Sequence, residues 1–190
     1  MRIAPVQLKK DLLATLFCFA AIILVILAFA GFYKQHKNIP PILENPNPLL
    51  RQVSQQIPSI DDSVVSLTDT MISTLHYQTV VDFFLDRSTP RGLAAPQIGI
   101  PKRLIVCGLH GSIQVMINPQ ILERKGTYVD YDECLSVKTV RAKKIKRSAY
   151  LKIKFTTLKN EEKILVVKND AAALVEHEID HLNGILNIDH

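Results

Sequence analysis

The sequence has few cysteines: Cys18, Cys107 and Cys134 are the only three among its 190 residues. An odd and sparse set excludes a small fold held together by several disulfide bonds, and it is typical of a reducing compartment. Internal repeats and low-complexity tracts are also missing, and the net charge of +5 is modest. The length is enough for one compact domain and an appendage.

Charged residues are absent from Leu12 to Tyr33, and almost every residue in this run is apolar. At 1.5 Å rise per residue, such a helix is long enough to cross a hydrocarbon layer of roughly 30 Å. A buried core helix would show a polar face, which this run does not have. A cleaved signal peptide stays an alternative, because Ala28-Phe29-Ala30 matches the small-x-small cleavage pattern. We expect residues 12–33 to form a single transmembrane helix.

The remaining sequence divides around this helix. Residues 1–11 are an N-terminal flank, and residues 34–46 are a predicted linker, because Lys34 to Pro48 contains four of the ten prolines. Residues 47–190 are then the globular domain. Lysines stand on both sides of the apolar run, so the positive-inside rule does not predict its orientation.

The domain shows one helical pattern near its start and another near its end. Asp61 or Asp62 can cap a helix with apolar residues at helical spacing, and Val80–Leu85 either extends that helix or forms an insert. A final helix begins at Asn169 or Asp170, with Gly184 at its C-terminal cap. Between them lie four strand-like runs, at 103–107, 113–117, 150–155 and 163–167. This order predicts an α+β fold with antiparallel strands packed around the C-terminal helix.

The final helix carries the pattern His177-Glu178-Ile179-Asp180-His181. Residues four apart share one face of a helix, so the two imidazoles can bind one metal ion. Glu178 lies beside that face, where it can reach a water molecule in an open coordination position. The alternative is a solvated face with incidental histidines, but the apolar Leu174 and Leu182 indicate a half-buried helix.

A third ligand is expected from upstream, because only nine residues follow His181. The candidates are carboxylates and the side chains of His36, His76, His110, Cys107 and Cys134. Cys107 ends an apolar strand and is more simply a small core residue. Cys134 lies in a polar segment, and its thiolate would complete a Cys-His-His site with one open position, as catalytic zinc-type sites have.

At this point the sequence resembles the peptide deformylase family, metal-dependent enzymes that remove the formyl group from the N-terminal methionine of nascent polypeptides. Three motifs carry the resemblance, in order: Arg91–Gly99 (RGLAAPQIG), Asp132–Ser136 (DECLS) and His177–His181 (HEIDH). The resemblance implies one divalent ion, Fe(II) or else Zn(II), bound by a cysteine and two histidines, with a glutamate as general acid/base. The residues that carry these roles are Cys134, His177, His181 and Glu178.

Further roles follow from the same resemblance. Gln97 and the backbone N–H of Leu135 would donate hydrogen bonds to the oxyanion, and Gly92 and Leu93 would contact the substrate. Three departures from the family pattern, Pro90, Asp132 and Glu133, put the substrate range and the rate in question. The alternative functions are a membrane-tethered metallopeptidase, a hydrolase of other N-acyl peptides, or a catalytically silent metal-binding homologue.

A basic run, free of acidic residues, lies between the second and third motifs. It is either a set of solvated strand faces or a surface for ribosomal RNA or anionic lipid; its members are Lys138, Arg141, Lys143, Lys144, Lys146, Arg147, Lys152 and Lys154. The expected partners are formylated nascent peptides, the ribosome through residues 138–154, and a membrane through residues 12–33. We expect a monomer whose catalytic domain faces the cytoplasm or the equivalent organelle interior, where formylated chains emerge.

Overall fold

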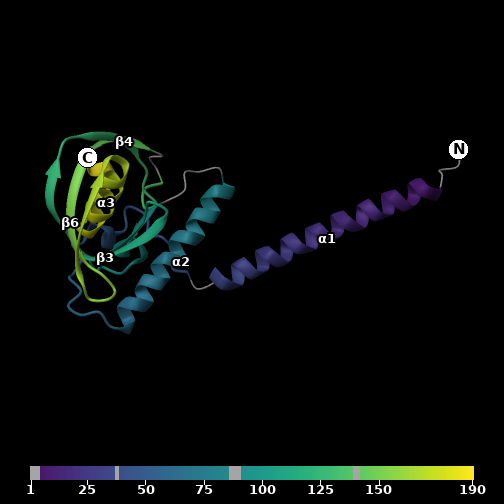
Figure 1. Cartoon of the computed structure of the whole chain (residues 1–190), viewed down its shortest axis with the longest axis horizontal. Helices are drawn as coiled ribbons and strands as arrows, with labels where there is room; N and C mark the ends of the chain where they lie inside the picture. Colours follow the sequence, from purple (N-terminus) through teal and green to yellow (C-terminus); the bar gives the residue numbers. More distant parts are fainter. Residues whose placement is uncertain (1–4, 37–38, 86–90, 139–141) are drawn as a thin grey trace. The chain divides into compact units, whose positions relative to one another are not determined.

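A computed structural model describes residues 5–36, 39–85, 91–138 and 142–190 (Figure 1). The chain forms two compact units, residues 1–38 and residues 39–190. The first unit contains the helix α1 (Pro5–His36), which extends beyond both ends of the predicted residues 12–33. Its window Thr15–Phe32 has a mean hydropathy of 2.7 and no buried residue, so α1 is long and apolar enough to cross a membrane.

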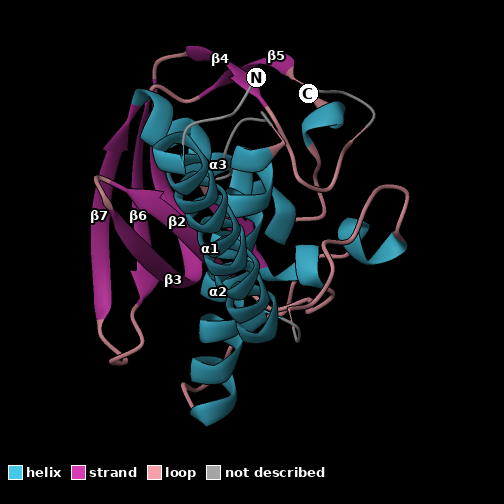
Figure 2. Cartoon of the chain, turned by 90° about the vertical axis from the view of Figure 1, so that its right-hand side faces the viewer, coloured by secondary structure: helices cyan, strands magenta, loops and turns pink. Residues whose placement is uncertain are grey.

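The second unit combines helices with antiparallel sheet, which confirms the predicted mixture of the two. Its strands are β1 (Gly92–Ala94), β2 (Leu104–Leu109), β3 (Ser112–Lys125), β4 (Tyr128–Asp132), β5 (Lys143–Arg147), β6 (Tyr150–Thr156) and β7 (Glu162–Lys168). Its helices are α2 (Asp62–Phe84) and α3 (Asn169–Leu182), with the short 3-10 helices η1 (Pro48–Arg51), η2 (Ala95–Ile98) and η3 (Asn187–Asp189). Five strands form one antiparallel sheet in the order β1-β2-β3-β6-β7, and β4 pairs with β5 (Figure 2).

The strand β2 is buried on both faces, because a helix covers each side of the sheet at this point. Leu104 and Val106 belong to the core cluster that contains the apolar side chains of α2. Ile105 and Cys107 point the other way, into the cluster that contains the apolar side chains of α3. This alternation explains the continuous apolar run that the sequence shows here, and it places Cys107 in the core.

The ends of both helices follow the predicted capping residues. The Asp61 carboxylate accepts hydrogen bonds from the N–H groups of Ser63 and Val64, at 3.0 and 3.1 Å, and so caps α2. This helix continues to Phe84, which resolves the alternatives for Val80–Leu85 in favour of an extension. The helix α3 ends in a turn at Gly184, whose φ of +75° suits a residue without a side chain.

The predicted linker and domain boundary differ from the structure. The compact unit begins at Ile39, eight residues before the expected start at residue 47. Leu43 donates its N–H to the Gln97 carbonyl at 2.7 Å, and Asn45 donates to the Ser136 carbonyl at 2.8 Å. Residues 39–46 therefore pack against the two segments that carry the first and second motifs.

Candidate metal centre and active site

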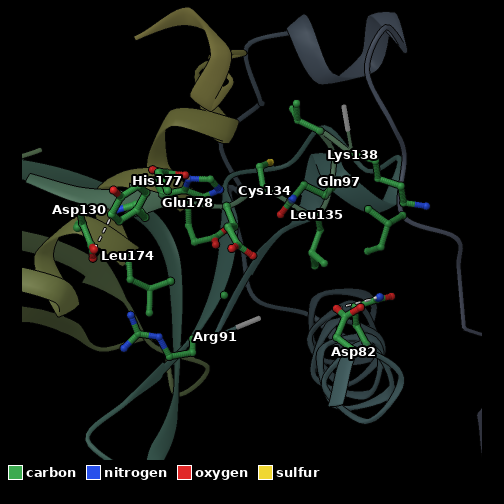
Figure 3. Close-up of a pocket in the computed structure, with 18 of the residues that line it drawn as sticks. Asp82, Arg91, Gln97, Asp130, Cys134, Leu135, Lys138, Leu174, His177 and Glu178 are labelled. Carbon is green, nitrogen blue, oxygen red and sulfur yellow. Dashed lines mark hydrogen bonds and ion pairs between the residues drawn. The ribbon is translucent and has the colours of Figure 1, made fainter. Parts of the chain in front are cut away.

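The helix α3 brings two histidine rings together, and a loop supplies a thiol beside them. The Nε2 atoms of His177 and His181 lie 3.2 Å apart, and Cys134 Sγ lies 3.3 Å from His181 Nε2. All three donor atoms lie within 4.8 Å of one another, and the three residues are buried. Cys107 is not in this group. The cysteine that lies beside the two histidines is Cys134, the one that the sequence favoured (Figure 3).

The chemistry of these three residues fits a divalent transition-metal ion. One thiolate and two imidazoles are the donors that zinc and iron sites use. Burial and the neighbouring His177 lower the pKa of His181 well below its usual value, so this ring keeps a lone pair for a metal. The Asp132 carboxylate lies 2.7 Å from His177 Nδ1, and it orients that ring so that Nε2 faces the other donors.

Arg147 forms buried ion pairs next to the two histidines. The sequence did not predict this role for Arg147. Its side chain is only 2% exposed, and it lies 2.7 Å from carboxylate oxygens of both Asp132 and Asp180. Burial lowers the pKa of the guanidinium, but the two carboxylates outweigh that effect and raise it. The sequence placed Arg147 in an exposed basic run, and this was wrong for Arg147 because it is buried and forms ion pairs with the two acids beside the candidate metal ligands.

Other members of the basic run also have acidic partners or lie outside the described residues. Lys154 lies 2.9 Å from Glu162, and Lys138 lies 2.5 Å from Glu44. Arg141 is outside the described residues. The members of the run therefore have different surroundings. Arg147 forms buried ion pairs, Lys138 and Lys154 form surface ion pairs, and other lysines of the run are exposed.

Glu178 is buried beside the candidate metal ligands. Burial raises the pKa of its carboxyl from 4.5 to about 7, where the group can both accept and release a proton at neutral pH. Among the described residues its Oε2 atom has no hydrogen-bond partner. Gly92 makes room for it, because a Cβ atom at Gly92 would lie 2.3 Å from Glu178 Oε1. The close approach of a substrate at Gly92 stays a prediction; the structure shows that this glycine allows the close approach of the Glu178 carboxylate.

Gln97 lies across the site from α3, and both ends of its amide are held. Its Oε1 atom accepts a hydrogen bond from the Ala94 N–H at 2.8 Å, and its Nε2 atom donates to Ser136 Oγ at 3.2 Å. The amide group has a second N–H on Nε2. Leu135, next to Cys134, lies on the same side, and Figure 3 shows both residues at the pocket.

These residues line one pocket of about 760 Å³. Cys134, His177, Glu178, Gly92, Gln97 and Leu135 all contribute to its wall. Leu93 does not, because its side chain is fully buried in the core cluster beside α2. The substrate contact predicted for Leu93 stays a prediction, and the side chain, which packs in the core, would take no part in it.

The departures from the family pattern fall in three different places. Asp132 is the partner of His177 and Arg147, so the shorter acid still reaches the histidine. Glu133 is exposed at the pocket wall. Pro90 lies outside the described residues. A carboxylate at position 132 thus keeps its contact with His177, one of the candidate metal ligands.

Comparison with known proteins agrees with this geometry. The family model "Polypeptide deformylase" matches residues 39–190. Peptide deformylase 1 of Clostridium acetobutylicum is 38% identical over 141 residues, which cover 74% of this chain and 87% of that protein. Peptide deformylase of Acetivibrio thermocellus is 34% identical over 148 residues, covering 78% of this chain and 81% of the relative.

Solved structures give the same result. The crystal structure of peptide deformylase from Thermotoga maritima matches with a TM-score of 0.71 at 31% identity, over 80% of this chain and 97% of that one. The actinonin-bound class I type b peptide deformylase of Acinetobacter baumannii matches with a TM-score of 0.70 at 28% identity, over the same shares. The chain belongs to the peptide deformylase family, and it has the deformylase function that its three motifs predict.

Proposed function

We propose that this chain hydrolyses the N-formyl group from the N-terminal methionine of nascent polypeptides, at the pocket between α3 and Gln97. The observation that carries the proposal is the buried Glu178 carboxylate beside three clustered donor atoms, Cys134 Sγ and the Nε2 atoms of His177 and His181. This combination offers a metal site and a proton acceptor in one cavity.

Cys134, His177 and His181 would hold one divalent ion, and we propose Fe(II) as the native metal, with Zn(II) able to occupy the same donors. When bound, the ion would act as a Lewis acid that makes water nucleophilic at neutral pH. The Asp132 carboxylate keeps the His177 ring in place through the 2.7 Å contact with Nδ1. Arg147 helps to keep Asp132 charged in a buried environment, since it forms ion pairs with that carboxylate and with Asp180.

Glu178 is the proton carrier in this mechanism. With a pKa of about 7, its carboxylate can take the proton of the attacking water and hold it at one oxygen. The same carboxyl group then gives the proton to the amine that leaves when the formyl C–N bond breaks. Gly92 permits this position, because any side chain there would displace the carboxylate.

Gln97 and Leu135 stabilise the negative charge that develops on the formyl oxygen. The contact from Ala94 N–H to Gln97 Oε1 turns the amide so that its Nε2 atom faces the segment that carries Ser136 and Leu135. A fixed amide donor needs no reorganisation when the oxyanion forms, and such donors are typically worth about 10²–10³ in kcat.

The ligand assignment is tested by metal analysis of the protein purified without oxygen. The wild type should bind one ion and release formate from formyl-Met peptides, whereas Cys134→Ala should lose both metal and activity. Cys107→Ala is the control, since Cys107 is a fully buried core residue outside the donor group. If Cys107→Ala loses the ion while Cys134→Ala keeps it, the proposed ligand set is wrong.

The helix α1 supports a second part of the proposal, a single-pass membrane anchor formed around residues 12–33. Formylated chains emerge where ribosomes work, so we place residues 39–190 on the cytoplasmic or organelle-interior side, with no cleavage after Ala30. A reporter active only in the cytoplasm, fused after His190, should be active. A silent reporter, or a mature chain that starts at Gly31, would contradict this topology.

A further inference from the structure

The C-terminal end of α2 carries three consecutive exposed apolar side chains, Phe83, Phe84 and Leu85, which we call the aromatic tip. They are 71%, 78% and 54% exposed, and the two phenylalanine rings pack edge to face with centroids 5.7 Å apart. Among the described residues of the 39–190 unit, no other three consecutive large apolar side chains are exposed. Contiguous exposed apolar surface of this kind marks an interaction site.

Folding of the domain does not use the aromatic tip. The helix α2 buries Val64, Met71 and Leu75 in the core, and this contribution ends before Phe83. Polar residues at positions 83–85 would therefore leave the core unchanged. Within the described part of the domain, nothing covers these two phenylalanines and the leucine.

The chain itself restricts which partner the aromatic tip can meet. Only six residues separate Phe32, where the apolar window of α1 ends, from Ile39, where the compact unit begins. Even a fully extended chain of this length spans no more than about 25 Å. If α1 crosses a bilayer, the domain stays next to the lipid surface whatever its orientation, and a tethered contact acts at high effective concentration.

We propose that the aromatic tip inserts into the interface of the same membrane that α1 crosses; this rests on the membrane-anchor part of the proposed function. Phenylalanine and leucine are the side chains that interfacial helices place among the lipid headgroups and upper acyl chains. The inserted tip has a consequence for the active site. Gln78 and Asp82, within two turns of the tip on α2, line the pocket that holds Glu178, as Figure 3 shows for Asp82. Insertion of the tip would then hold these two pocket residues within two helical turns of the membrane interface.

The sequence contains no tryptophan, so a single introduced tryptophan reports its own environment. Three variants of the full chain are reconstituted in vesicles of lipids brominated along their acyl chains, which quench tryptophan in contact with them. Phe84→Trp probes the aromatic tip, Leu24→Trp probes the apolar window of α1, and Ile164→Trp is the matched control. Ile164 is 58% exposed on the edge strand β7, away from the tip.

We expect Phe84→Trp to lose fluorescence and shift to shorter wavelength in the brominated vesicles, as Leu24→Trp does, while Ile164→Trp keeps its emission. Adding Phe83→Ser and Leu85→Ser to the Phe84→Trp variant should abolish the quenching. Equal hydrolysis of a soluble formyl-Met peptide by all variants in detergent shows that the domain is folded, since none of these positions lines the pocket.

The controls separate failure of this inference from failure of the anchor. Quenching of Leu24→Trp without quenching of Phe84→Trp overturns the inference and leaves the anchor intact. Equal quenching of Phe84→Trp and Ile164→Trp also overturns it, because the contact is then not specific to the tip. An unquenched Leu24→Trp overturns the anchor and the inference together.

Discussion

Gly92 lies so close to Glu178 that only a residue without a side chain leaves room for the carboxylate. A methyl group at Gly92 would lie 2.3 Å from Glu178 Oε1, well inside van der Waals contact. Because the carboxylate must move, we expect Gly92→Ala to lower kcat about a hundredfold, the typical cost of a small displacement of a reacting group. Metal content should not change, since the three heavy atoms nearest to such a Cβ all belong to Glu178 and none to the three donor residues.

Gly108→Ala is the matched control for this prediction. Gly108 lies on the neighbouring strand β2, where an added Cβ would meet its nearest neighbour, the Arg91 carbonyl oxygen, at 3.4 Å. Formate release and bound metal are measured for both variants. Equal activity of Gly92→Ala and the wild type would show that the Glu178 carboxylate is not confined by this glycine.

At the scale of residues, the three candidate metal donors were predictable from the sequence. The buried ion pairs of Arg147 with Asp132 and Asp180 were not. Helical spacing alone brings His177 and His181 onto one face, and the polar surroundings of Cys134 distinguish it from Cys107 in a strand. Arg147 was missed because its neighbours are lysines. The signal was present, however: Ile145 and Arg147 alternate with exposed Lys144 and Lys146, so in a strand Arg147 shares the inward face of Ile145.

At the scale of elements, helix ends were more predictable than strands. Asp61 and Gly184 act through local backbone geometry, which a sequence shows directly. The strands β1, β4 and β5 were not predicted. The first is three residues long, and the other two carry mainly charged and aromatic residues, so their pairing depends on partners elsewhere in the chain.

The end of α3 offers a prediction at this scale. Gly184 has a φ of +75°, and a Cβ there would lie 2.5 Å from the Arg51 carbonyl oxygen, so Gly184→Ala adds both backbone strain and a clash. Gly111 has a similar φ of +79° but no atom within 4 Å of such a Cβ. Gly111→Ala should cost roughly 1 kcal/mol of unfolding free energy from strain alone.

Gly184→Ala should cost a further 1–3 kcal/mol or so, because overpacking against backbone is poorly relieved. Urea unfolding of both variants, followed by far-UV circular dichroism, gives the difference. Equal destabilisation of the two variants would mean that the contact between the end of α3 and Arg51 is not tight in solution.

At the scale of the whole molecule, the domain boundary was predicted too late. Prolines between residues 34 and 48 suggested a linker, but residues 39–46 are held by main-chain hydrogen bonds to Gln97 and Ser136. Composition cannot reveal this, because the bonding partners lie about fifty and ninety residues downstream. A proline-rich segment can be extended and still belong to a folded domain.

Truncation tests this boundary. A chain of residues 39–190 should fold and hydrolyse formyl-Met peptides, since it retains every residue of the pocket. A chain of residues 47–190 should unfold at lower urea and lose activity, because Leu43 and Asn45 no longer bond to the segments that hold Gln97 and Ser136. Equal activity and stability of the two chains would show that residues 39–46 are a linker after all.

Glu178→Gln tests most directly whether Glu178 moves the proton in a metal-dependent deformylation. The amide has nearly the same shape as the carboxyl group but cannot accept a proton from water. The measurement is formate release from a formyl-Met peptide together with bound metal per chain, for this variant and the wild type. We expect one ion in both proteins and a loss of about 10²–10⁴ in kcat for Glu178→Gln, the usual contribution of general acid–base catalysis. An unchanged rate with the ion bound would contradict the mechanism, and loss of the ion would show that Glu178 is itself a ligand.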